Sequence, residues 1–208
     1  SRTGHERNYD PFSPSPTSKT ETRDDNVIPL PGHEDELAKA EQEAEADPVW
    51  AGYAEEGSDL ANGLQEVAGA DSSFAPGEFL EGAKMAYEMI VTAFAEGDKK
   101  SLKSLLTTDV YKGFATAIDQ RASDGETLDY KFVGIDNATL AASTMVRRKA
   151  NVTVKFVSEM ISATRDVTGD VIDGDPKQIR EVTDVWTFER DTSSRDPNWK
   201  LSATEATD

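Results

Sequence analysis

The chain has 208 residues, with 22 Lys and Arg, 40 Asp and Glu and no cysteine, so its formal net charge is −18. This charge argues against a nucleic-acid partner held through phosphate neutralisation. The absence of cysteine excludes a disulfide framework, a thiolate metal site and a cysteine nucleophile. The only histidines, His5 and His33, lie near the N-terminus, so the rest of the chain cannot hold a Ser-His-Asp triad or a His-rich metal site. We expect no metal and no cofactor.

The first 57 residues differ in composition from the rest. Six of the nine prolines fall within the first 48 residues, and residues 20–60 carry thirteen acidic and two basic side chains. Such a segment cannot bury enough apolar surface to offset the entropy of ordering its backbone. The composition therefore predicts an acidic, proline-rich, disordered linker over residues 1–57, followed by one domain over residues 58–208.

Helical patterns come first in this domain. Ser58 is a suitable N-cap for an amphipathic helix over 58–70, which lies in an N-terminal segment 58–75. In residues 76–125, the spacing of Phe79, Tyr87, Ile90 and Phe94 predicts a long helix that ends near Gly97. Two shorter helices are expected over 101–106 and 109–125.

After residue 125 the hydrophobic period changes to two. Alternating residues predict strands around 128–132, 139–146, 152–156, 182–188 and 199–204, with a break at 170–175 that is typical of a hairpin. Helices followed by consecutive strands over 126–206 favour an α+β fold, with the helices packed on one face of an antiparallel sheet.

The order of several segments resembles a known family. The resemblance is carried by residues 79–83, Tyr87, Ile90, 93–95, 97–98, Leu102, Leu105, 110–111, 114–118, 184–190 and 197–201. These residues are similar to the domain that the mitochondrial inner-membrane translocase subunit Tim44 shares with its bacterial relatives. Residues 2–7 and 25–32 also resemble the stretch that follows the N-terminal membrane anchor in bacterial members. The resemblance covers about residues 58 to 207.

This resemblance implies a cystatin-like fold, as in nuclear transport factor 2, in which helices pack on the concave face of a curved antiparallel sheet. It also implies a non-catalytic role in protein translocation or membrane-protein assembly, with membrane proteins or translocation components as partners and a lipid or apolar peptide as a possible ligand. The expected location is the inner membrane, peripheral or anchored by a segment missing from this chain, with the domain on the cytoplasmic side. The region before the domain is short and acidic, so partners that the mitochondrial protein binds through its long N-terminal region are not carried over.

An apolar pocket between the long helix and the sheet is the first candidate site, and ordinary core packing is its alternative. The resembled fold spaces helices and sheet apart, which favours a pocket that binds apolar guests. Its expected lining consists of aromatic and aliphatic side chains from both layers: Phe79, Tyr87, Ile90, Phe94, Tyr111, Phe114, Tyr130, Phe132, Val154, Phe156, Trp186 and Phe188.

Two further patterns each have two interpretations. Leu60, Leu64, Val67 and Phe74 form either a membrane or client contact surface or the inner face of a helix folded back on its own domain. The basic run 147–149 is either a solvated strand end or a contact for an acidic partner. These alternatives depend on which side chains are buried.

Asp184 alternates in phase with Trp186 and Phe188, so it is expected to point inward. A buried carboxylate could act as a general base in a small-molecule enzyme of the same fold, together with pocket tyrosines. The simpler interpretation is a carboxylate paired with Arg180, Arg190 or a tyrosine hydroxyl.

Overall fold

The structure, a computed structural model, describes residues 46–207. Residues 1–45 of the linker expected over 1–57 lie outside the described residues. The folded unit begins at Asp47, and Val49, Trp50 and Ala54 are partly buried against the core. The domain boundary expected at Ser58 is therefore too late, because Trp50 adds apolar surface to the core from within an acidic stretch.

Four helices precede the sheet in the described residues, as expected. They are α2 (Asp59–Ala70), α3 (Pro76–Glu96), α4 (Lys99–Leu105) and α5 (Thr108–Ser123). Ser58 caps α2 by accepting a hydrogen bond from the backbone N–H of Ala61 at 3.1 Å. Gly97 ends α3 in the left-handed conformation, with φ 73°, which glycine adopts without steric cost.

The sheet is antiparallel throughout and contains five strands. They are β1 (Thr127–Val146), β2 (Lys149–Arg165), β3 (Val171–Gly174), β4 (Arg180–Asp191) and β5 (Lys200–Thr207). The strand order is β1-β2-β4-β5, and the short β3 pairs with the end of β2. The two strands expected over 128–132 and 139–146 are one continuous strand. Register shifts near Phe132, Ile135 and Leu140 change the phase of the hydrophobic alternation and so divide the pattern.

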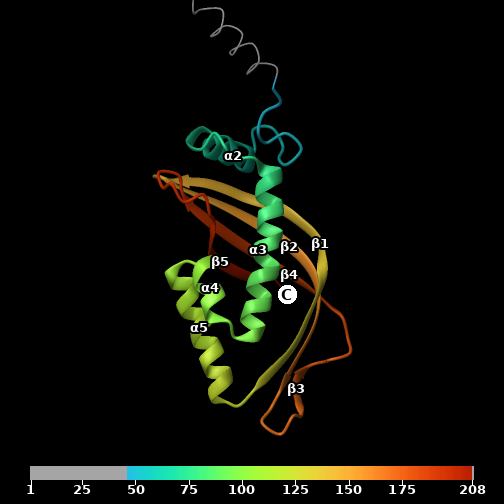
Figure 1. The fold of residues 1–208 in the computed structure, drawn as a ribbon. Coiled ribbons are helices and arrows are strands. Elements are labelled where there is room, and N and C mark those ends of the chain that lie inside the picture. Colours follow the sequence, from blue (N-terminus) through green and yellow to red (C-terminus); the bar gives the residue numbers. More distant parts are fainter. Residues whose placement is uncertain (1–45, 208) are drawn as a thin grey trace, which may run out of the picture. The chain divides into compact units, whose positions relative to one another are not determined.

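The helices lie on one face of this sheet, and the long strands curve around α3 (Figure 1). This confirms the α+β class and the packing of helices on the concave face. The β1–β2 turn carries Arg147 and Arg148, which are exposed. The basic run is therefore a solvated strand end, and a contact with an acidic partner stays a prediction.

Helix α2 is folded back against β1 rather than held away from the domain. A Cβ atom added to Gly63 would lie 1.8 Å from the carbonyl oxygen of Ser143 in β1, so the two backbones are closer than any other residue type permits. Leu64 and Val67 on the same helix face are fully buried. This close approach holds α2 against β1 of the sheet.

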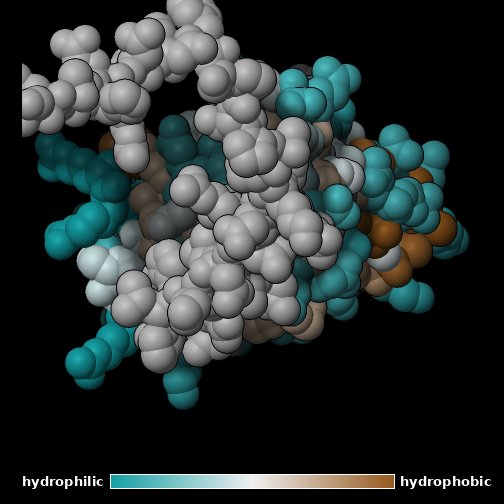
Figure 2. All heavy atoms as spheres, turned by 90° about the horizontal axis from the view of Figure 1, so that it is seen from above, coloured by the Kyte–Doolittle hydropathy of each residue, from teal (hydrophilic) through white to brown (hydrophobic). Residues whose placement is uncertain are grey.

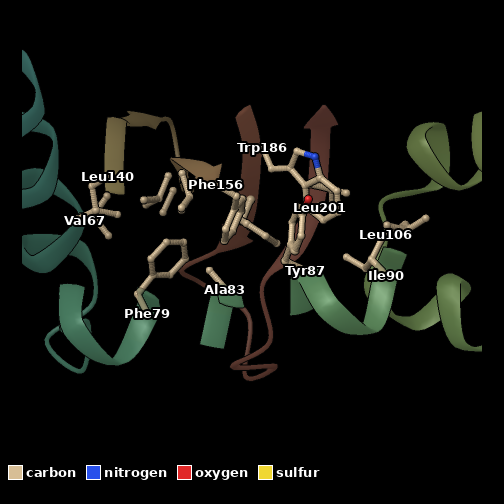
Figure 3. Close-up of a cluster of buried hydrophobic side chains, with 14 of the residues drawn as sticks. Val67, Phe79, Ala83, Tyr87, Ile90, Leu106, Leu140, Phe156, Trp186 and Leu201 are labelled. Atoms are coloured by element: carbon tan, nitrogen blue, oxygen red, sulfur yellow. The ribbon is translucent and has the colours of Figure 1, made fainter. Parts of the chain in front are cut away.

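Figure 3 shows the buried side chains that α3 and the strands contribute to the core, with Phe79, Ala83, Tyr87 and Ile90 following one face of the helix. Trp186 is 4% exposed, and Phe156 and Phe188 are buried beside it. The inward register of β4 is therefore as expected. This core determines where hollows remain between the layers.

Candidate functional site

The centre of the helix–sheet interface is densely packed. The Tyr87 ring centroid lies 4.5 Å from the centroids of both Phe156 and Trp186. These distances are those of aromatic rings in contact. The interface therefore contains no single cavity along the whole of α3, and its hollows lie on either side of this packed centre.

The first hollow, which we call the Asp184 pocket, has a volume of about 320 Å³ and lies between the C-terminal half of α3, α5 and the sheet. Most of its lining is apolar. Within the described part of the chain, no Lys or Arg contributes to it, and Asp184 supplies the only carboxylate. The lining residues are Val91, Phe94, Ala95, Phe114, Leu128, Tyr130, Met160, Ser162, Val182, Asp184, Trp186, Thr204 and Ala206.

Asp184 is held by a short chain of hydroxyl groups. The Tyr87 hydroxyl donates to Asp184 Oδ2 at 2.7 Å and lies 2.9 Å from Ser158 Oγ. Because the single Tyr87 proton is directed to the carboxylate, Ser158 acts as the donor to Tyr87. Burial raises the pKa of Asp184, and the hydrogen bond from Tyr87 offsets only part of this increase. Burial and the Asp184 carboxylate both raise the pKa of Tyr87. The tyrosine partner expected for Asp184 is thus the one that the structure provides.

Tyr130 supplies a second polar group to this pocket. Its hydroxyl is buried and has no hydrogen-bond partner among residues 46–207. Burial, followed by the charges of Glu88 and Asp184, raises the pKa of Tyr130 to about 12, so the hydroxyl stays neutral at physiological pH. A buried polar group without a partner costs free energy, and such groups in folded proteins commonly await a water or a ligand.

The second hollow, which we call the methionine groove, has a volume of about 600 Å³ and lies along the other side of α3. Met85 and Met89 line it one helical turn apart and are 64% and 53% exposed. Its further lining comes from the α2–α3 connection, the N-terminal half of α3, α4, β4 and the loop before β5: Asp71, Ser73, Phe74, Ala75, Glu78, Phe79, Gly82, Ala83, Ala86, Ser104, Leu105, Phe188, Arg190, Pro197, Asn198 and Trp199.

An ion pair between Asp71 and Arg190 closes one end of this groove. Both side chains are only 13% exposed. Burial alone would raise the pKa of Asp71, but hydrogen bonds from Ser73 and the Arg190 guanidinium outweigh it and lower that pKa. The pair connects the residue after α2 to the end of β4.

The residues expected to line one apolar pocket do not lie together, and the structure places them in five different surroundings. Phe94, Phe114, Tyr130 and Trp186 line the Asp184 pocket, and Phe79 and Phe188 line the methionine groove. Tyr87, Ile90, Val154 and Phe156 are buried in the core between them. Phe132 lines a small hollow beside Tyr130, and Tyr111 lies elsewhere, beside Lys103 and Lys200.

The expected contact surface on α2 is largely internal in this structure. Leu64, Val67 and Phe74 are buried, and Leu60 is partly buried against the same core. Since α2 packs on β1 through Gly63, these side chains stabilise the domain and are not exposed to a membrane or client. The folded-back interpretation of this helix is the one that the structure supports.

Sequence reasoning missed Met85 and Met89, and also the Asp71–Arg190 pair. The two methionines are four residues apart on the face of α3 opposite its aromatic stripe, so their spacing could have identified an apolar second face. No signal in the sequence connects Asp71 to Arg190, because the two residues are 119 positions apart.

A family model for the Tim44-like domain matches residues 60–206. The chain belongs to the Tim44-like domain family. Curated relatives include the mitochondrial import inner membrane translocase subunit TIM44 of Homo sapiens and the probable subunit tin-44 of Caenorhabditis elegans. Each is 24% identical, over 147 and 148 residues respectively and 69% of this chain. The alignments cover 32% and 35% of these two relatives, so this Tim44-like chain spans about a third of their length.

Two solved structures are also similar to this Tim44-like domain. The intermembrane space region of the chloroplast protein ARC6 is 14% identical with a TM-score of 0.42, over 61% of this chain and 95% of that one. A conserved protein from Planctomyces limnophilus is 17% identical with a TM-score of 0.36, over 63% and 98%. Among the helices in residues 46–207, none has the length and hydropathy needed to cross a bilayer.

Proposed function

We propose that this Tim44-like domain is a non-catalytic binding module for protein translocation or membrane-protein assembly at the inner membrane. The observation that carries the proposal is the methionine groove, an open apolar hollow on a domain whose relatives are named as translocase subunits. Membrane proteins or translocation components would be its partners.

The occupant that best fits the groove is an apolar helical segment of a client protein. A volume of about 600 Å³ admits several side chains of such a segment, and a groove beside a helix is a common way to bind one. Methionine side chains are flexible and polarisable, so surfaces that contain them adapt to different apolar sequences. Met85 and Met89 therefore suit a module that binds varied clients.

Gly82 offers a direct test of this proposal. It lines the groove, and a Cβ atom added there meets no other atom within 4 Å. In the full chain, Gly82→Leu places a side chain in the groove without disturbing the core, and leucine is a better helix former than glycine. Gly113→Leu in α5 is the matched control, because Gly113 has equally open surroundings and does not line the groove.

The measurement is a titration with an apolar helical peptide and, separately, with an acyl-chain probe, each at low and high salt. We expect micromolar affinity for the peptide, weakly dependent on salt because apolar burial drives binding. Gly82→Leu should weaken it by about ten-fold, the effect of losing one well-buried apolar side chain. Equal affinity of the two leucine variants would contradict the groove as the client site, and binding of the acyl probe alone would point to a lipid.

A small-molecule enzyme is the second candidate, favoured by one observation. Asp184 is half-buried with a raised pKa at the side of a pocket, as expected of a general base. The Tyr87 proton already satisfies one of its oxygens, and the expected Tyr111 does not join the site. The test is the exchange of carbon-bound protons of an added small carbonyl compound with solvent. Exchange in the wild-type chain that is lost in Asp184→Asn would favour this alternative.

A further inference from the structure

The Asp184 pocket combines three features that the client-binding proposal does not use. Its carboxylate belongs to none of the ion pairs found among residues 46–207. Tyr130 lines the same pocket, and its hydroxyl is buried without a hydrogen-bond partner among these residues. Aromatic side chains from α3, α5, β1 and β4, namely Phe94, Phe114, Tyr130 and Trp186, line the same hollow.

Each feature favours a positive charge. The attraction between a carboxylate and a cation is stronger in an apolar environment than in water, so a cation that enters the pocket stabilises the carboxylate most. Aromatic rings attract cations through the negative electrostatic potential of their faces. An N–H donor would also satisfy the Tyr130 oxygen and the second oxygen of Asp184, both of which can accept.

An anionic head group fits poorly here. No Lys or Arg lines the pocket, so a carboxylate or phosphate would meet Asp184 without compensation. The remaining lining is apolar, with Val91, Leu128 and Met160 available to an alkyl chain. The volume of about 320 Å³ corresponds to a small amphiphile rather than a folded peptide segment.

We infer that the Asp184 pocket binds a primary alkylammonium cation, with the ammonium group between Asp184 and the Tyr130 hydroxyl and the alkyl chain against the aromatic and aliphatic lining. This inference does not depend on the role of the methionine groove, which lies on the other side of α3. The raised pKa of Asp184 agrees with it, because it reflects a half-buried carboxylate that no cation among residues 46–207 compensates.

A matched series of ligands tests the head group in the full chain. Octylamine, 1-octanol and octanoate share one chain, and octylamine is cationic at pH 7. Calorimetric titration should give about ten-fold tighter binding for octylammonium than for 1-octanol, the size of one charge-assisted hydrogen bond, with octanoate the weakest. Trimethyloctylammonium keeps the charge without N–H donors, so its affinity should fall between those of octylammonium and 1-octanol.

Two variants separate this site from general attraction of cations to an anionic protein. Asp184→Asn can still accept the Tyr87 proton, and it should lower octylammonium affinity to that of 1-octanol while leaving 1-octanol unchanged. Tyr130→Phe removes only an unpartnered hydroxyl, so the fold should persist while octylammonium affinity drops several-fold. Gly82→Leu, which fills the other hollow, should have no effect on this ligand.

Equal affinity for octylammonium and 1-octanol, tightest binding of octanoate, or unchanged octylammonium binding in Asp184→Asn would each overturn the inference. Should Asp184→Asn fail to fold, Tyr130→Phe and the trimethylated ligand decide the question alone. Failure of client binding in the groove would leave these results untouched, so the two proposals can fail separately.

Discussion

Asp71 and Asp184 are both carboxylates held on the helix-covered side of the sheet, and they have opposite surroundings. Asp71 pairs with Arg190, and its pKa is lowered. Asp184 has a tyrosine partner, forms no ion pair with any of the residues that the structure describes, and has a raised pKa. Asp71 contacts β4 through Arg190, whereas Asp184 lies on β4 itself and contacts Tyr87 of α3.

The difference separates a structural carboxylate from an available one. An ion pair whose members are both largely buried is costly to break, because the remaining charge loses its compensation. Asp71 therefore fastens the residue after α2 to β4. Asp184 keeps a charge that the fold does not compensate, and this arrangement is typical of sites that await a ligand or a proton.

The largest expected effect comes from removing the packed centre that separates the two carboxylates. Trp186→Ala should lower the free energy of unfolding by about 3–5 kcal/mol, because it leaves a cavity beside Tyr87 and Phe156. Chemical denaturation measures this. Val185→Ala, on the opposite face of β4, is the control and should cost less than about 1.5 kcal/mol. A larger cost at Val185 than at Trp186 would contradict the register of β4.

The next effect tests the paired carboxylate. Arg190→Met should cost about 3 kcal/mol at pH 7, since it leaves Asp71 charged and largely buried. The pKa of Asp71 is lowered in the folded state, so its stabilisation is present above its ordinary value of 3.8 and is lost as pH falls through the lower folded value. The penalty of Arg190→Met should therefore shrink in acid.

Lys149→Met is the control for this experiment. It removes an exposed pair with Glu189, which is worth less than about 1 kcal/mol. A penalty for Arg190→Met no larger than this would mean that the Asp71–Arg190 pair contributes no more than a surface contact. In that case Asp71 and Asp184 would differ in solvent exposure and not in how far the fold compensates their charge.

Much of the layer order followed from the sequence because local patterns determine it. Period-two alternation placed Asp184, Trp186 and Phe188 on one face of β4, and helical spacing placed Phe79 and Tyr87 on one face of α3. These are the faces that the structure buries together. Because this alternation also placed Asp184 on the inner face, a tyrosine hydroxyl was among its expected partners.

The two hollows could not be predicted, because they depend on how far the layers diverge. Tyr87 packs directly against aromatic rings of the sheet, whereas Phe94 packs against Phe114 of α5 and a hollow remains beside it. The bulges that bend β1 carry no period of their own. The Asp71–Arg190 pair and the packing of Trp50 are long-range contacts. Spacing along a single sequence gives no information about such contacts.

The smallest effect, and the one specific to the unpaired carboxylate, is the pH dependence of stability in Asp184→Asn. The folded pKa of Asp184 is raised above its ordinary value of 3.8. Between these two values the folded state binds more protons than the unfolded state, so stability falls as pH rises. The cost of burying the charge is absent below about pH 4 and fully present above the folded pKa.

Asparagine has no charge to bury and still accepts the Tyr87 hydrogen bond. The difference in unfolding free energy, Asp184→Asn minus wild type, should therefore become more positive as pH rises from about 4 to 7, while the other carboxylates contribute equally to both proteins. Denaturant unfolding at several pH values measures it. Tyr87, Tyr130 and Glu88 are the titratable groups that act on this pocket, and Tyr130→Phe should leave the trend unchanged. A difference that becomes more negative with pH would place a compensating cation near Asp184 and would make its carboxylate a second structural one, like Asp71.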